Sequence, residues 1–428
     1  MLTRKFLRAK IIGLSARARR LAQIDAEGAG IRPQDRPYAP SQAHFRAANQ
    51  RLALIDRKIA ARLGNLEQTW SQEPKQRVLV KIALVEREID RARRAFGLFF
   101  EVFSQRGSAF APSLSAHDVI AEDCYRAVRE SAPNQFRGPL IKPLCYMEHS
   151  FSPATIRRGV LLNRLLGEPN PFPLVRIPWD RDNPWQAVFL HKVSHNLQAD
   201  MGIWQENRQA VVRRLIRSTG DPALTRIYGL WHKEIFADLA AILLGGPASA
   251  FGMASFLAHP APRTMTFRPG GAHPTAYLRV HILAEMLRRL GFADEAHRLG
   301  RVWDDLYNPV RFNRLPQRLL ATSSRIIPEV VDEIAFQTRR NLAHRALADI
   351  IPFYAENERA IQAGAKVLAR GQMPDDLPPR WLVSASSYAL ARNTIASRLL
   401  SELVVKRLNE LKTSSATGLG ETPLSMAA

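Results

Sequence analysis

Two short polar motifs constrain this chain more than any other feature. The first is His191-Lys-Val-Ser-His195, and 39 residues after it begins the second, Glu234-Ile-Phe-Ala-Asp238. Residues four apart lie on one face of a helix, so each motif predicts a helix that presents two polar side chains together. Two histidines and a glutamate are the three protein ligands of a catalytic zinc, which leaves a fourth position for water. A fold that uses both motifs must bring the two helices face to face.

The combination of motifs is more specific than either alone. With 11 histidines in 428 residues, a His-x-x-x-His pair arises by chance roughly 0.3 times. The downstream carboxylates add independent roles, because Glu234 can complete a metal site while Asp238 accepts a hydrogen bond from a ligand histidine and fixes its tautomer. We therefore predict His191, His195 and Glu234 as zinc ligands, supported by Asp238. The alternative is that the histidines are ordinary helix residues and the carboxylates form surface ion pairs.

At these motifs the chain resembles the gluzincin group of zinc metallopeptidases, which pair His-Glu-x-x-His with a downstream Glu-x-x-x-Asp helix. The run at 234–247 is similar to that of uncharacterised bacterial zincin-like proteins, where a Pro-rich strand precedes the histidine helix and a His-Pro dipeptide follows the second helix. Pro173–Pro178 and His273-Pro274 stand in the corresponding places. The resemblance covers roughly residues 140–300. It implies a zincin-like helical core and makes His273 our first choice for a substrate-facing group.

One position departs from the family pattern. Where gluzincins carry the glutamate that activates the zinc-bound water, this chain has Lys192. A protonated lysine cannot accept a proton, and its reference pKa is about 10.4. An ammonium about 5 Å from a divalent ion would be repelled by roughly 6 to 7 kcal/mol at an effective dielectric constant of 20. Lys192 must therefore turn into solvent, lose its proton, or replace the metal by pairing with Glu234 and Asp238.

All three outcomes predict weak or absent peptide hydrolysis, so our first hypothesis is a non-catalytic binding or scaffold module, a pseudoenzyme, in which zinc occupancy is open. The second is an active zinc-dependent hydrolase that uses another general base, such as Glu148 or Glu206. The third is a nucleic-acid or membrane-surface binder that acts through the basic N-terminal region. Zinc content and salt-dependent association with polyanions distinguish the three.

The net charge of +22 is concentrated near the N-terminus. Residues 1–107 hold 22 Lys/Arg against 10 Asp/Glu, a net of +12. This bias favours an anionic partner, which could be an acidic protein, nucleic acid or anionic lipid. Solvated helix faces in an arginine-rich protein are the alternative explanation. The segment Met1–Leu14 has no acidic residue and could form a basic amphipathic arm on a membrane surface.

Neither a secretory signal nor a membrane span is expected. Arg4, Lys5, Arg8 and Lys10 interrupt the first apolar stretch. The longest uncharged run, Leu239–Ala258, contains Gly245-Gly246-Pro247 and is better explained as a buried helix, a turn and a second helix. Two cysteines give no disulfide framework, which favours a reducing, cytoplasmic location.

The hydrophobic pattern predicts a mainly α (α+β) fold. Apolar residues spaced alternately three and four apart indicate a helical hairpin over 41–106 with its turn at Ser71–Pro74, and Pro173–Pro178 could be a strand of a small sheet. Further helices are expected at 116–130, 185–200, 205–218, 222–244, 274–290, 293–307, 328–351, 353–369 and 379–411, the last with a break near Arg392-Asn393.

These elements suggest five parts. They are a basic N-terminal arm at 1–40, a helical hairpin at 41–107, a zincin-like domain at 108–312, a C-terminal helical region at 313–412 and a disordered tail at 413–428.

Overall fold

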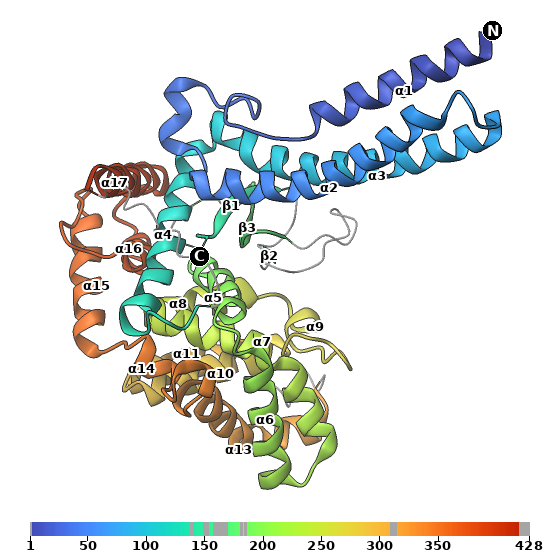
Figure 1. Ribbon diagram of the computed structural model, residues 1–428. Coiled ribbons are helices and arrows are strands. Elements are labelled where there is room, and N and C mark those ends of the chain that lie inside the picture. Colours follow the sequence, from blue (N-terminus) through green and yellow to red (C-terminus); the bar gives the residue numbers. More distant parts are fainter. Residues whose placement is uncertain are drawn as a thin grey trace. The chain divides into compact units, whose positions relative to one another are not determined.

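The structure is a computed structural model in which helices dominate and three short strands form the only described sheet (Figure 1). The mainly α fold class with a small sheet is therefore confirmed. The backbone is described over residues 2–136, 141–148, 154–156, 170–179, 183, 186–308 and 315–418.

The chain divides into two compact units. The first consists of Met1–Leu114, Leu144–Met147 and Ile156–Leu174. The second consists of Ser115–Pro143, Glu148–Thr155 and Val175–Ala428. The five-part division drawn from the sequence stays a prediction.

The N-terminal unit is built on a helical hairpin. Helix α2 (Gln42–Thr69) and helix α3 (Lys75–Ser104) pack along each other, which confirms the predicted hairpin and its turn. Helix α1 (Leu2–Arg20) packs on both of them through a buried apolar face. The seam between the hairpin helices is apolar at the predicted three- and four-residue spacing and includes the buried residues Leu52, Ile55, Ile59, Val78, Ile82, Val85 and Ile89.

The sheet has the order β1–β3–β2, where β1 is Leu144–Glu148, β2 is Ala154–Ile156 and β3 is Leu174–Pro178. Strand β3 confirms the strand predicted between the two prolines. Strand β1 is anchored by the end of the hairpin, because Gln105 exchanges hydrogen bonds of 2.8 and 2.7 Å with the backbone of Met147. Arg106 is fully buried and donates to the Cys145 carbonyl. Cys124 and Cys145 are both free and buried.

Helices make up most of the second unit. Those that correspond to predicted helices are α4 (Ala111–Ser131), α5 (Val188–Asp200), α6 (Trp204–Thr219), α7 (Pro222–Gly245), α10 (Ala276–Arg289), α11 (Ala293–Leu306), α15 (Ala355–Leu368), α16 (Pro379–Ala391) and α17 (Ser397–Gly418). The chain also forms α8 (Pro247–Leu257), α9 (Ala261–Thr264), α13 (Gln317–Val331) and α14 (Leu347–Ile350).

Helix α7 is the centre of this unit. Its start is set by Asp221, whose carboxylate accepts hydrogen bonds from the backbone N–H groups of Ala223 and Leu224, with Pro222 at the first helical position. From Glu234 to Gly245 every residue is buried, and α5, α6, α8 and α10 all pack against the helix. A helix buried on all sides needs no polar face, so the polar residues it does carry require an explanation.

The long uncharged run is two helices, as the sequence predicted. Helix α7 ends at Gly245. The next residue, Gly246, has a φ of 68°, and α8 begins at Pro247. A Cβ at Gly246 would also clash with the ring of Phe353. No helix in the described part of the chain is long and apolar enough to cross a membrane.

The single helix predicted over 328–351 is wrong. Pro328 lies inside the last turns of α13 rather than at a helix start, and a π-helical turn at Asp332–Phe336 follows. The chain then folds back, with Arg339 bridged to Arg345 and both Ala343 and His344 at positive φ. The apolar pattern runs on through this turn because Ile334, Leu342 and Ile350 are still buried, so periodicity alone could not reveal the break.

Near the C-terminus the predicted break is confirmed. Helix α16 ends at Ala391 and Asn393 adopts a φ of 54° before α17 begins. The backbone of α17 is helical to Gly418, although the sequence predicted disorder from residue 413. Residues 419–428 lie outside the described part of the chain.

Candidate metal centre

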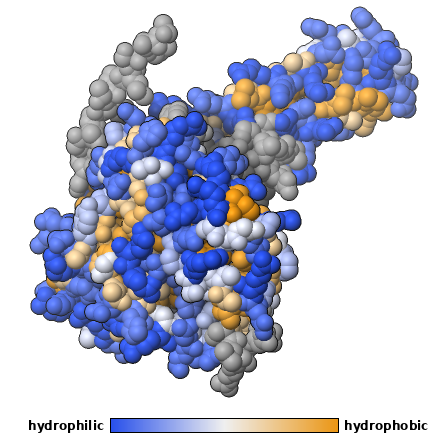
Figure 2. Space-filling model, turned by 90° about the horizontal axis from the view of Figure 1, so that it is seen from below, coloured by the Kyte–Doolittle hydropathy of each residue, from blue (hydrophilic) through white to orange (hydrophobic). Residues whose placement is uncertain are grey.

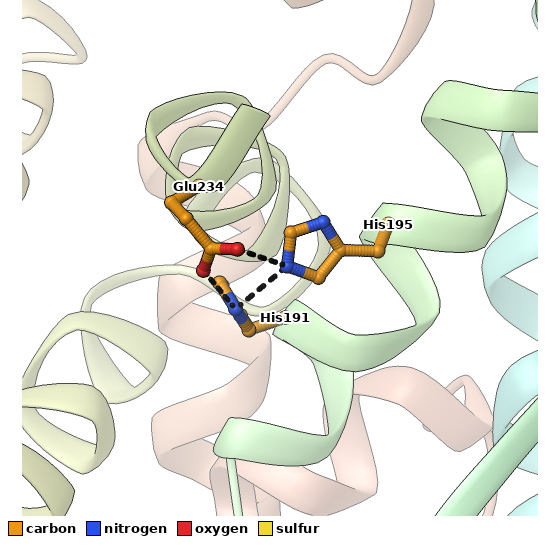
Figure 3. Close-up of side chains that lie close together, drawn as sticks. All are labelled: His191, His195 and Glu234. Atoms are coloured by element: carbon orange, nitrogen blue, oxygen red, sulfur yellow. Dashed lines mark hydrogen bonds and ion pairs between the residues drawn. The ribbon is translucent and has the colours of Figure 1, made fainter. Parts of the chain in front are cut away.

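Helices α5 and α7 pack side by side and bring the two polar motifs together. The histidine Nε2 atoms of His191 and His195 are 3.1 Å apart. Glu234 completes a triangle with them, since its two carboxylate oxygens lie 3.5 Å from His191 Nε2 and 3.4 Å from His195 Nε2 (Figure 3). Within the described residues, this is the group of His, Cys, Asp and Glu side chains whose ligand atoms could hold one metal ion.

The size of this triangle fits zinc. Zinc binds nitrogen and oxygen ligands at about 2.0–2.1 Å, so two ligands of a tetrahedral site are about 3.3 Å apart. The three separations of 3.1, 3.5 and 3.4 Å are close to that value. Moreover, Glu234 Oε2 is a buried oxygen that has no hydrogen-bond partner in the described structure. A buried carboxylate oxygen without a hydrogen-bond donor is costly unless a cation satisfies it. The types of the three ligand atoms and this unsatisfied oxygen therefore both agree with a metal site.

Asp238 orients the ring of His191 from the side opposite the triangle. Its Oδ1 lies 2.8 Å from His191 Nδ1, so the ring donates its Nδ1–H to the carboxylate and keeps the Nε2 lone pair for the triangle. Burial acts to raise the pKa of Asp238, but the Arg279 guanidinium and His191 outweigh it and hold that pKa below the ordinary value. Asp238 is therefore a carboxylate, in the geometry expected for its supporting role.

The remaining ligands are also in the protonation state that binds metal. Burial lowers the pKa of His195 to about 4, although Glu234 acts in the opposite direction. Burial acts to raise the pKa of Glu234, but its contacts with His191 and His195 and the nearby Arg279 guanidinium hold it well below its ordinary value. At neutral pH the site therefore offers a neutral imidazole and a carboxylate, which are the forms that coordinate zinc.

Arg279 is a component that the sequence reasoning missed. From α10 it donates Nε and Nη2 to the two oxygens of Asp238 at 2.5 and 2.7 Å, and Nη2 is 3.6 Å from Glu234 Oε2. Nη2 is also 3.3 and 3.2 Å from the two ring nitrogens of His191, so it lies beside the ring and not in line with the Nε2 lone pair. The signal in the sequence that could have revealed it is an arginine among the apolar residues of the run Tyr277–Val280.

Lys192 does not form the ion pairs with Glu234 and Asp238 that the sequence suggested. Burial lowers the pKa of its ammonium, while Glu234 and Asp238 act to raise it. No hydrogen bond or ion pair of the ammonium is found among the described residues, and the guanidinium of Arg279 pairs with Asp238 instead. The Lys192 backbone carbonyl accepts a 2.9 Å hydrogen bond from Thr155 Oγ1 next to strand β3. The half-buried lysine is thus near the triangle without neutralising it.

His273 lies at the solvent side of the ligands. Its side chain is 67% exposed, and its Nε2 is 3.4 Å from Glu234 Oε1. Burial of the inner part of the ring lowers its pKa, which Glu234 partly opposes. His273 is outside the triangle itself. Its proposed contact with a substrate stays a prediction.

Neither carboxylate considered as a replacement base is free. Glu148 pairs with Arg176 at 2.8 Å. Glu206 accepts hydrogen bonds of 2.7 and 3.1 Å from the backbone N–H groups of Arg340 and Asn341. Both have other structural partners.

No known protein family, curated protein or solved structure that was compared with this chain matches it. The assignment of this site therefore rests on the two motifs and on their geometry.

Proposed function

We propose that this protein is a zinc-binding, zincin-like module that does not hydrolyse peptides. The observation that carries the proposal is a triangle of metal ligands of zinc-compatible size directly beside a lysine, where a peptidase needs a carboxylate. His191, His195 and Glu234 would hold the ion, and Asp238 would keep His191 in the correct tautomer.

A bound zinc would supply a Lewis acid and lower the pKa of a coordinated water. Hydrolysis also needs a group that accepts a proton from that water and then delivers it to the leaving amine. Both carboxylates of the site have other roles, since Glu234 belongs to the ligand set and Asp238 is bound by His191 and Arg279. This supports a site that binds without turnover.

The surrounding charges are compatible with a metal. Arg279 is adjacent to the triangle, but its charge is balanced by the two hydrogen bonds to Asp238. The ion would therefore meet one negative ligand, Glu234, and the charge of Lys192, for which no balancing ion pair occurs among the described residues. The lysine weakens zinc binding by electrostatic repulsion but does not remove a ligand. Replacement of Lys192 should consequently strengthen zinc binding.

Three variants test the proposal through zinc content by elemental analysis and cleavage of a mixture of fluorogenic peptides. The unmodified protein should retain zinc and cleave no peptide. Lys192→Glu should gain zinc-dependent cleavage, whereas Lys192→Gln, which removes the charge without adding a base, should bind zinc and remain inactive. His195→Ala should lose zinc. Strong zinc-dependent cleavage by the unmodified protein would contradict the proposal.

The second candidate is an active zinc hydrolase with a different base. It is favoured by the exposed imidazole of His273, 3.4 Å from Glu234, and by the lowered pKa of Lys192. This candidate requires that the unmodified protein cleaves peptides and that His195→Ala abolishes the cleavage. If His273 is the base, His273→Ala should reduce cleavage at least about 100-fold, and if Lys192 is the base, Lys192→Gln should do so.

A further inference from the structure

Helix α1 has two apolar faces, although a helix at the surface of a water-soluble unit needs one. The inner face packs against the hairpin and consists of Leu7, Ile11, Leu14 and Ala18. The second face repeats at intervals of four, three, four and three residues and is exposed at every position, namely Leu2, Phe6, Ala9, Gly13 and Ala16. Because both stripes have helical spacing but point in opposite directions, packing on the hairpin leaves the second one uncovered.

The uncovered face carries large side chains. Leu2 is 84% exposed, Phe6 64% and the neighbouring Ile12 58%. Seen from below, the N-terminal unit also has hydrophobic residues at its surface among hydrophilic ones, on the side of the hairpin helices (Figure 2). Isolated exposed apolar residues are ordinary, but a leucine and a phenylalanine one turn apart at the start of one stripe are a candidate contact surface.

The same helix is strongly basic. Residues 2–20 contain seven Lys/Arg and no Asp/Glu. Lys10 forms an ion pair of 2.8 Å with Glu86, which helps to fix α1 on α3. Lys5, Arg17 and Arg20 are exposed, and no ion pair to them occurs in the described part of the chain. At about 100° per residue, these three cations lie beside or within the second face, whereas Arg4 lies on the opposite side of the helix, so the three are available to an anionic partner of that face.

This combination of charge and hydrophobicity selects one kind of partner. A second copy of α1 would bring two helices with a charge of the same sign together. Nucleic acid would use the cations, but contact with phosphates gives no reason for exposed leucine and phenylalanine. An anionic lipid bilayer uses both, since phosphates pair with the cations while apolar side chains enter the boundary between headgroups and acyl chains.

We propose that the outer face of α1 docks on an anionic lipid bilayer, with Leu2 and Phe6 inserted at the interface and Lys5, Arg17 and Arg20 paired with lipid phosphates. The helix lies in the plane of the interface while its inner face stays on the hairpin. This surface gives the binding module an anionic partner and is separate from the zinc triangle, which is in the other compact unit.

Flotation of the full chain with vesicles tests this surface. Binding is expected to vesicles that contain 30% phosphatidylserine and not to pure phosphatidylcholine, and it should weaken with salt. Leu2→Ser combined with Phe6→Ser should reduce affinity by at least about tenfold. Lys5→Gln combined with Arg17→Gln should reduce it by about 30-fold, because each removed cation contributes about a factor of five. The matched control is Val302→Ser, a 56% exposed residue on α11 that should change nothing.

Circular dichroism and zinc content of each variant separate this proposal from the preceding one, because an unfolded variant or a lost metal would be seen there independently of lipid binding. Unchanged vesicle binding by the Leu2/Phe6 variant would overturn the proposal. So would equal affinity for duplex DNA that depends on the cations alone, since that result would assign α1 to nucleic acid.

Discussion

Arg279 and Asp238 form a buried, two-point ion pair directly behind the proposed zinc ligands, with Nε–Oδ2 and Nη2–Oδ1 distances of 2.5 and 2.7 Å. The pair connects α10 to α7, and Asp238 in turn lies 2.8 Å from His191 Nδ1 on α5. The orientation of a ligand on α5 thus depends on a residue 88 positions away in the chain.

Removal of the guanidinium should destabilise the protein. Arg279→Met leaves Asp238 as a buried charge with only His191 beside it, and we expect a loss of about 3–5 kcal/mol in the free energy of unfolding by urea titration. The double variant Arg279→Met, Asp238→Leu removes both charges and should recover most of that loss. Equal losses in the single and double variants would mean that the pair is not coupled.

Asp238 should contribute to zinc affinity without touching the ion. Asp238→Asn retains the shape but weakens the hydrogen bond that fixes the His191 tautomer, so zinc affinity measured by competition with a chelating dye should fall by about 10- to 100-fold. Glu206→Gln is the control, because Glu206 caps backbone N–H groups elsewhere. If the two variants bound zinc equally well, Asp238 would have no part in the site.

The dependence of stability on pH should change at Glu358. Burial raises the pKa of this half-buried carboxyl above its ordinary value of 4.5, with Glu295 adding to the effect while Gln362 and Tyr388 oppose it. A raised pKa in the folded state gives stability that is present below pH 4.5 and is lost as the pH rises through the folded pKa. Glu358→Gln should therefore raise the free energy of unfolding at pH 7, and the gain should vanish near pH 4.

Glu356→Gln is the matched control for this effect. A backbone hydrogen bond and Arg359 lower the pKa of the exposed Glu356, so its replacement should change stability slightly and in the opposite direction at pH 7. A loss of stability at pH 7 in Glu358→Gln would show that the charged form is the favoured one.

The turn that separates α7 from α8 should tolerate only glycine. Gly246→Ala combines a φ of 68° with a clash against Phe353 and should cost about 2 kcal/mol or more. By contrast, Gly97→Ala, on α3 with open space around it, should stabilise the protein by about 0.5–1 kcal/mol. The midpoint of thermal unfolding should therefore fall in Gly246→Ala and rise in Gly97→Ala. A neutral Gly246→Ala would show that the turn adjusts.

The sequence was sufficient for features that depend on local periodicity. The alternating apolar seam of α2 and α3 predicted the hairpin, and Gly245-Gly246-Pro247 predicted the end of α7. The spacing within each motif placed His191 with His195 and Glu234 with Asp238, because residues four apart share a helix face. That these two faces meet was predicted from the combination of the two motifs, and the structure brings them together.

Features that depend on tertiary partners could not be predicted in this way. Arg279 lies on a helix with no motif of its own, and its role follows only from the contact with α7. The chain reversal after α13 is stabilised by the Arg339 side chain, which reaches Asn207 on α6 at 2.8 Å. Apolar periodicity continued through that reversal and therefore predicted one helix, where the chain forms the end of α13, a π-helical turn, a 3-10 turn and α14.

The central claim is that the lysine-containing motif still belongs to a zinc site. Elemental analysis of the purified, unmodified protein tests it most directly. The account predicts close to one equivalent of zinc per chain, retained through dialysis and absent from His195→Ala. A zinc content near zero in the unmodified protein, equal to that of His195→Ala, would contradict it and leave Arg279 and Lys192 as cations that offset the charges of Glu234 and Asp238.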